Sequence, residues 1–174
     1  IKSGLLGENS ESYIETIENL GALYSITGSF DKAEELLKKV NEAYRDICGT
    51  LSPKYVKSLY NLGNMYTDRG KFAEAGEYLD KALEHAKKLR DFDVADMEDI
   101  RVSIGRLCKK SGNYKRALDE YERAVKISEE REEEPSYFKM RFLLAYALLC
   151  QRCELYDRAA EIYESAVAVR EELI

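Results

Sequence analysis

The side chains that could do chemistry in this sequence are a cysteine pair, one histidine and many carboxylates. Cys150 and Cys153 have the spacing of a zinc-ligand or redox pair. A zinc site needs a second ligand pair, and the sole histidine, His85, belongs to a distant segment. A general base at His85 would need a nucleophile and an orienting group, and neither can be assigned. We therefore predict no enzyme activity and no catalytic, metal or cofactor site, and we interpret the cysteines as structural thiols of a reducing compartment.

A second group of polar side chains could bind a ligand without reacting with it. Asn19 and Asn61 each precede a Leu-Gly pair, and Asn64 follows one turn later. An amide side chain both donates and accepts hydrogen bonds, so it suits the backbone of an extended peptide. These asparagines are candidate ligand contacts, although exposed helix surfaces also carry asparagine without any ligand.

Charge and hydropathy exclude two classes of partner. The net charge is −6, with 33 acidic against 27 basic residues, whereas nucleic-acid binding requires a basic surface. The sequence contains no apolar run of the roughly 18–20 residues that a membrane span needs. We predict a protein that binds neither nucleic acid nor membrane.

A pattern that recurs every 42 residues predicts the elements that position these side chains. Four dipeptides recur at this interval, namely Leu20-Gly21, Leu62-Gly63, Ile104-Gly105 and Tyr146-Ala147. Downstream of them the same interval separates four alanines, Ala33, Ala75, Ala117 and Ala159, and three turn glycines, Gly28, Gly70 and Gly112. A fixed period of this length indicates stacked supersecondary units.

Each unit is predicted to be a pair of helices. In the first unit Ile17, Leu20, Gly21 and Tyr24 fall on one face at three- and four-residue steps. Glycine is unfavourable inside a helix, so Gly21 implies the close approach of a neighbouring helix. The second helix presents small Ala33, with Leu37 and Val40 on the same stripe. Gly28 separates the two helices, because glycine accepts the left-handed conformation just past a helix end.

The order apolar-x-x-Leu-Gly-x-x-Tyr, then Ala-x-x-x-large, then a small residue, resembles the tetratricopeptide repeat. The 42-residue period and the Asn19-Leu20-Gly21 and Asn61-Leu62-Gly63 segments are similar to the long repeats of kinesin light chains. The resemblance implies an all-α fold, a right-handed α-solenoid of four antiparallel helix pairs. It also implies a cytoplasmic scaffold or adaptor that binds proteins.

We expect a flexible lead-in at residues 1–11 and a single repeat domain at residues 12–174. The four repeats are expected at about 12–49, 52–91, 93–132 and 135–174. Their helices are predicted at about Ser12–Thr27, Phe30–Cys48, Ser52–Arg69, Phe72–Arg90, Val94–Ser111, Tyr114–Arg131, Ser136–Cys153 and Tyr156–Leu173. The acidic run Glu129–Glu134 is interpreted as a solvated helix end.

Several helix ends carry recognisable signals. Ser12 with Glu15 predicts a capping box for the first helix. Ser52 before Pro53 predicts a cap for the third helix, and Asp93 is a candidate cap for the fifth. In the fourth repeat Glu154 replaces the turn glycine, so the geometry of that turn is not predicted.

The concave wall of such a stack is lined by the first helix of each pair. Opposite the buried stripe, the candidate partner-binding residues are Asn19, Lys57, Tyr60, Asn61, Asn64, Ser103, Arg106, Lys109 and Arg141. The wall is acidic in the first repeat, at Glu15 and Glu18, and basic in the third and fourth. Opposite charges orient a partner, so we expect an acidic stretch of the ligand over Arg106, Lys109 and Arg141.

The leading hypothesis is a protein- or peptide-binding adaptor that uses this groove. One alternative is a regulatory sensor whose repeats respond to a signalling peptide. Another is a self-assembling array, because the last helix carries apolar residues with no following repeat to cover them: Ile162, Val167, Val169, Leu173 and Ile174. The chain begins at Ile1 rather than Met, so we expect it to be part of a longer protein, and a missing following repeat is our favoured explanation of that apolar surface.

Overall fold

The structure, a computed structural model, describes residues 11–130 and 136–173. Within these ranges the chain forms helices and no strand. The helices are α1 (Glu11–Ile26), α2 (Phe30–Cys48), α3 (Pro53–Arg69), α4 (Phe72–Lys88), α5 (Val94–Lys110), α6 (Tyr114–Glu130), α7 (Tyr137–Arg152) and α8 (Tyr156–Glu172). Apart from Glu11, the predicted lead-in lies outside the described residues, as do Ile174 and most of the acidic run 129–134.

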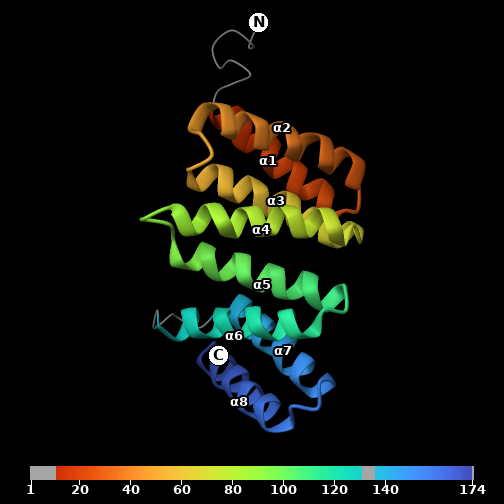
Figure 1. Cartoon of the computed structure of the whole chain (residues 1–174), viewed down its shortest axis with the longest axis vertical. Helices are drawn as coiled ribbons and strands as arrows, with labels where there is room; N and C mark the ends of the chain where they lie inside the picture. The colour runs from red at the N-terminus through yellow and green to blue at the C-terminus, as the bar shows by residue number, and fades with distance from the viewer. Residues whose placement is uncertain (1–10, 131–135, 174) are drawn as a thin grey trace, which may run out of the picture. The chain divides into compact units, whose positions relative to one another are not determined.

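The helices pack in consecutive pairs, α1 with α2, α3 with α4, α5 with α6 and α7 with α8 (Figure 1). These pairs coincide with the four predicted repeats, and the predicted helix ends agree with the structure to within two residues. The all-α helical-repeat solenoid predicted from the 42-residue period is therefore confirmed. The period succeeds because it locates the two features that a helix pair needs, a close-packed small residue and a turn.

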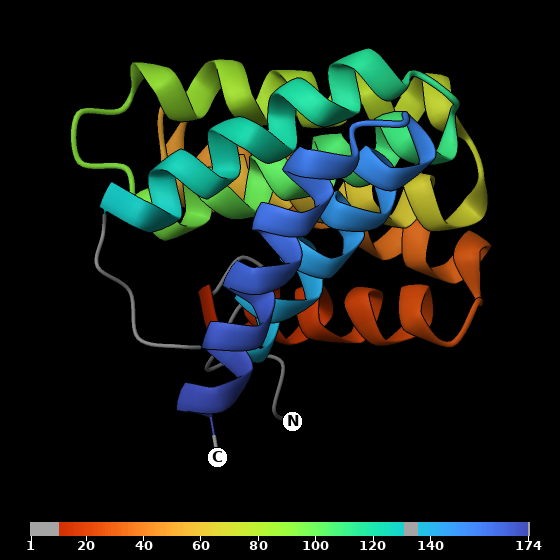
Figure 2. The same cartoon turned by 90° about the horizontal axis from the view of Figure 1, so that it is seen from below.

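The chain separates into two compact units, Ile1–Phe92 and Asp93–Ile174. In the first unit α2 also packs against α3 and joins the two pairs. In the second unit α6 contacts α7, and Figure 2 shows α7 and α8 lying side by side. Whether the four repeats act as a single domain remains a prediction.

The signature glycines allow the two helices of a pair to approach closely, as predicted. A Cβ atom added to Gly63 would lie 2.5 Å from Cγ of Leu79, on the paired helix α4. A Cβ atom on Gly21 would lie 3.0 Å from Leu37 of α2. The alanines of the second helices, which in the first two repeats lie one turn before Leu37 and Leu79, are buried as well. Close helix contact therefore explains why both positions carry small residues.

The first helix departs from the predicted burial pattern. Leu20 was expected in the core but is 40% exposed, whereas its equivalent Leu62 is 0% exposed. The reason is that α2 covers the corresponding face of α3, while no described segment packs on that face of α1. Exposed Leu23 and Ile26 extend the same apolar side of α1.

The last helix is better covered than its sequence suggested. Ile162 and Val169 are buried, and Leu173 is half-buried. Among the described residues of the apolar surface predicted on the last helix, only Val167 is strongly exposed, at 56%. The expected apolar end face is therefore small, because α7 packs against most of the apolar side of α8.

Two of the predicted caps are confirmed and one is wrong. The Ser52 hydroxyl accepts a hydrogen bond from the Tyr55 amide at 3.2 Å, with Pro53 in the first turn. The Asp93 carboxylate accepts one from the Ala95 amide at 2.7 Å. Ser12 is not a cap, because α1 begins at Glu11 and Ser12 lies inside the helix.

Glu154 adopts the left-handed conformation that glycine adopts in the other repeats. Its φ is 62°, and the φ values of Gly28, Gly70 and Gly112 lie between 77° and 84°. A side chain in this region costs roughly 1–2 kcal/mol. We expect Glu154→Gly to raise the free energy of unfolding by about 1 kcal/mol, measured by urea unfolding. An unchanged or lower value would contradict the assignment of strain to this turn.

The four cysteines are free. Cys108 and Cys150, which stand at the 42-residue equivalents of Tyr24 and Tyr66, are buried, and burial raises the pKa of the Cys150 thiol. A buried thiol with a raised pKa is poorly reactive. None of the helices in the described part of the chain is both long and apolar enough to cross a membrane.

Candidate functional site

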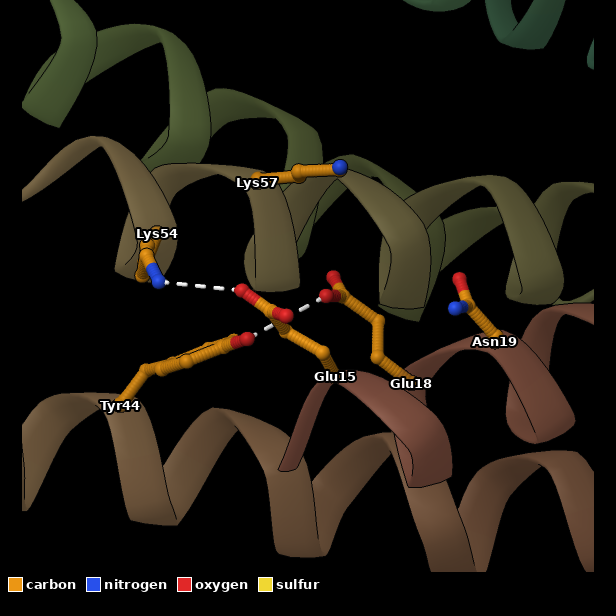
Figure 3. Close-up of a pocket in the computed structure, with 6 residues that line it drawn as sticks. All are labelled: Glu15, Glu18, Asn19, Tyr44, Lys54 and Lys57. Atoms are coloured by element: carbon orange, nitrogen blue, oxygen red, sulfur yellow. Dashed lines mark hydrogen bonds and ion pairs between the residues drawn. The ribbon is translucent and has the colours of Figure 1, made fainter. Parts of the chain in front are cut away.

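A polar pocket of about 200 Å³ lies among α1, α2 and α3 in the first unit (Figure 3). Its lining residues are Glu15, Glu18, Asn19, Tyr44, Lys54 and Lys57. Two of them, Asn19 and Lys57, were predicted as partner-binding residues. The pocket therefore brings together side chains from the first helices of two neighbouring repeats.

The helical period explains how the pocket is assembled. Glu15 and Glu18 are one turn apart on α1, and Lys54 and Lys57 are one turn apart on α3. The two helices contact each other, so the carboxylates face the ammonium groups. Tyr44 enters from the last part of α2.

Glu18 is a buried carboxylate, with only 7% of the residue exposed. Its Oε1 accepts a hydrogen bond from Nδ2 of Asn61 at 2.7 Å. Its Oε2 accepts one from the Tyr44 hydroxyl at 3.4 Å, and Figure 3 shows this second bond. Burial raises the pKa of Glu18, although nearby Lys57 and the two hydrogen bonds act in the opposite direction. Desolvation of the carboxylate outweighs these favourable contacts.

The raised pKa of Glu18 predicts a pH dependence of stability. The Glu18 carboxyl binds its proton more tightly in the folded chain than in the unfolded chain. The contribution of Glu18 to the free energy of unfolding therefore falls as the pH rises from the ordinary glutamate pKa through the raised pKa. We expect the Glu18→Gln variant not to show this fall. At pH values above the raised pKa we expect it to be more stable than the original protein, because a neutral amide avoids the cost of burying a charged carboxylate. Urea unfolding across pH 4–8, taken as the difference between the two proteins, isolates Glu18; parallel curves would contradict the prediction.

Lys54 is occupied by interactions within the protein. Its ammonium group pairs with Glu11 and, at 3.2 Å, with Glu15. It also lies 5.9 Å from the centre of the Tyr44 ring. These contacts fix Lys54 against the wall of the pocket.

Asn19 and Lys57 are different, because both side chains are exposed. Within the described part of the chain, neither side chain makes a hydrogen bond or ion pair, and no dashed line reaches either of them in Figure 3. The pocket thus offers one amide and one ammonium group to a ligand.

The other residues predicted on α3 are less open. Asn61 is half-buried and donates to Glu18, so its amide stabilises the contact between two repeats. Tyr60 and Asn64 are also half-buried, and both interact with other parts of the protein.

In the second unit the predicted residues differ in exposure. Ser103 is buried, at 6%, while Arg106 and Lys109 are half-buried and Arg141 is exposed. Burial lowers the pKa of Lys109, and the positive charges of Arg106 and Lys110 lower it further. Lys109 therefore lies in a positively charged environment that a bound carboxylate would relieve.

Three family models, each describing the tetratricopeptide repeat (TPR), match residues 14–53, 54–130 and 103–171. The chain belongs to the TPR family. The resemblance inferred from the 42-residue pattern is therefore confirmed. Among curated proteins no sequence matches the chain significantly.

Solved TPR structures share the fold at low sequence identity. BtubC (BKLC) from P. vanneervenii has a TM-score of 0.81 at 20% identity, over 92% of this chain and 64% of that one. Kinesin-light-chain-like TPR repeats from Podosopora anserina have a TM-score of 0.75 at 20% identity, over 99% and 81%. The Rap protein in complex with competence and sporulation factor has a TM-score of 0.80 at 18% identity, over 92% and 43%. The chain thus spans less than two thirds of BtubC and Rap.

Membership of the TPR family indicates a protein-interaction module. TPR proteins are generally scaffolds without enzyme activity. In residues 11–130 and 136–173 no group of three or more His, Cys, Asp or Glu side chains is arranged so that it could hold a metal ion.

Sequence reasoning missed Tyr44 and Lys54 as pocket residues. Tyr44 lies four residues after Val40, so its position on the apolar stripe of α2 suggested only a core role. Lys54 follows Pro53 in the first turn of α3, before the TPR signature begins.

Proposed function

We propose that this TPR chain is an adaptor module that binds a protein or peptide along the wall formed by its first helices. The observation that supports the proposal is the pairing of Asn19 and Lys57. They come from neighbouring first helices, enter one pocket and make no bond to the protein within its described part. Free cysteines favour a reducing compartment, so we place the adaptor in the cytoplasm.

The chemistry of the pocket favours the backbone of the ligand over a charged side chain. Two carboxylates and two ammonium groups line it, so its formal charge is balanced. The Asn19 amide can donate to a peptide carbonyl and accept from a peptide N–H, and the Lys57 ammonium can donate to a second carbonyl. Main-chain contacts of this kind give affinity with little dependence on sequence.

The second unit adds specificity for an acidic stretch of the partner. Arg106, Lys109 and Arg141 supply positive charge, and the lowered pKa of Lys109 supports a preference for an anionic group there. Charge complementarity selects and orients a partner. Reversing the charge at Arg106 and Arg141 together should weaken the binding of an acidic ligand, and the affinity that remains should depend less on salt. Unchanged binding would contradict this part of the proposal.

The proposal is tested with peptides selected from a random library for binding to the purified chain. We expect Asn19→Ala with Lys57→Ala to weaken the affinity of the selected peptides at least about tenfold, which corresponds to roughly 1.4 kcal/mol. Fluorescence anisotropy with labelled peptides measures the dissociation constants.

Lys87→Ala on α4 is the matched control. Lys87 is exposed on a second helix, and its replacement removes one positive charge, as Lys57→Ala does. It should bind as the original chain does. Equal affinities for the Asn19/Lys57 variant and the control, or no selectable peptide, would overturn the proposal.

A regulatory role is the second candidate function. It is supported by the structural similarity to the Rap protein, which was solved with competence and sporulation factor. A sensor should change its compactness when a short peptide binds, and an adaptor should not. Small-angle scattering with and without a saturating selected peptide distinguishes the two.

A further inference from the structure

The second unit contains a cavity of about 250 Å³, open to solvent on one side, among α6, α7 and α8. Its surface is mostly apolar, and Ser128, Glu129, Lys139 and Ser165 are its polar lining residues. Its walls include the buried side chains of Val125, Phe142 and Leu143. Ala168 and Ser165 of α8 lie at the exposed mouth. The cavity is separate from the predicted groove residues, since none of them lines it.

The equivalent place in the first unit, two repeats earlier, is filled by the protein's own rings. Ser128, Lys139 and Val169 correspond, in that order, to Tyr44, Tyr55 and His85. Tyr55 and His85 meet edge to face, with their ring centres 5.4 Å apart. Tyr55 also packs on the buried cluster that contains Tyr44. The cavity therefore exists because the second unit replaces aromatic side chains with serine, lysine and valine.

From this substitution we propose that the cavity binds one free aromatic molecule of phenol or indole size. An enclosed apolar cavity of about 150 Å³ holds benzene, so by volume alone this open pocket of about 250 Å³ accommodates a single or fused ring. The Phe142 ring in the wall offers an aromatic contact. Lys139 lines the cavity and is half-buried, so its ammonium group can lie over the face of a bound ring.

Binding is tested with indole and with phenol as probes on the full chain, by saturation-transfer NMR and titration. We expect saturable binding to the original chain. Lys139→Tyr with Val169→His reproduces the ring pair of the first unit and should abolish that binding. The same variant should raise the melting temperature, because the rings fill the space from within.

A second variant keeps the test valid if the filled cavity distorts the fold. Ala168→Trp places a ring over the mouth and should block the probes, whereas Ala160→Trp, on an exposed part of α8 outside the cavity, should not. Failure of both probes to bind the original chain, or equal binding to the Ala168 and Ala160 variants, would overturn the proposal. Tighter cavity-dependent binding of a tryptophan peptide than of indole would assign the site to a partner's side chain instead and would overturn the free-ligand proposal.

Discussion

Replacing Arg101 and Glu120 together with Leu and Ile is expected to leave the free energy of unfolding unchanged or to raise it by about 1–4 kcal/mol. The two side chains form an ion pair at 2.7 Å, with 13% and 6% of them exposed. Taking both charges out of water is costly, and the Nε atom of Arg101 finds no hydrogen-bond partner in the described part of the chain.

The fourth repeat shows that this position accepts apolar residues. Leu143 and Ile162, which are the 42-residue equivalents of Arg101 and Glu120, are both buried. Removing one partner is different, because it leaves the other charge buried without compensation. We expect Glu120→Ala to lower the free energy of unfolding by about 3–5 kcal/mol.

Urea unfolding of the single and double variants measures this difference. The exposed pair of Arg45 and Asp46, at 3.0 Å, provides the control, since a surface pair contributes about 0–1 kcal/mol. A double variant as unstable as Glu120→Ala would show that the ion pair itself stabilises the third repeat.

The second large effect is expected at Gly63. Alanine there would place Cβ 2.5 Å from Cγ and 2.8 Å from Cδ2 of Leu79, and 3.2 Å from the Leu79 backbone nitrogen. Alanine favours a helix over glycine by about 1 kcal/mol, but forced overpacking costs about 1–3 kcal/mol and sometimes more. We expect Gly63→Ala to lower the free energy of unfolding by about 1–3 kcal/mol, because α4 cannot move away without opening the core.

Gly21→Ala is the matched comparison for Gly63→Ala. The three atoms nearest to that Cβ would all be side-chain atoms, two of Leu37 at 3.0 Å and one of Leu36 at 3.4 Å. We expect the helix preference and the steric cost nearly to cancel, within about 1 kcal/mol. If Gly63→Ala stabilised the chain as it would an isolated helix, the close approach of α3 and α4 would be refuted.

The helix pairs could be predicted from the sequence because their determinants are local and repeated. Gly63 and Ala75 report a helix crossing by their size, and Gly70 reports a turn by its backbone conformation. Each signal recurs after 42 residues, so an exception such as Leu20 does not obscure the pattern. Leu20 itself could not be predicted, because its exposure depends on what packs beside α1.

The candidate site could be predicted only in part, because it depends on contacts between repeats. The sequence placed Asn61 on the wall, but it could not show that its amide is bound to Glu18 of the preceding repeat. Ser103 was predicted on the same wall from its position and is buried by its neighbours. Likewise Arg101 and Glu120 are residue types expected on the surface, and the ion pairs of Glu120 with Arg101 and with Arg123 could not be predicted from their positions.

The central claim is that a ligand lies against the first helices, and the side-chain amide signal of Asn19 reports on it most directly. Nitrogen-15 NMR should be recorded while a selected peptide is titrated into the chain, with the signal assigned from Asn19→Ala. We predict that this signal shifts saturably, in step with the dissociation constant, while backbone signals of the exposed face of α4 around Lys87 remain in place. Saturable shifts confined to the second helices α2 and α4, with the Asn19 signal unmoved, would contradict the claim.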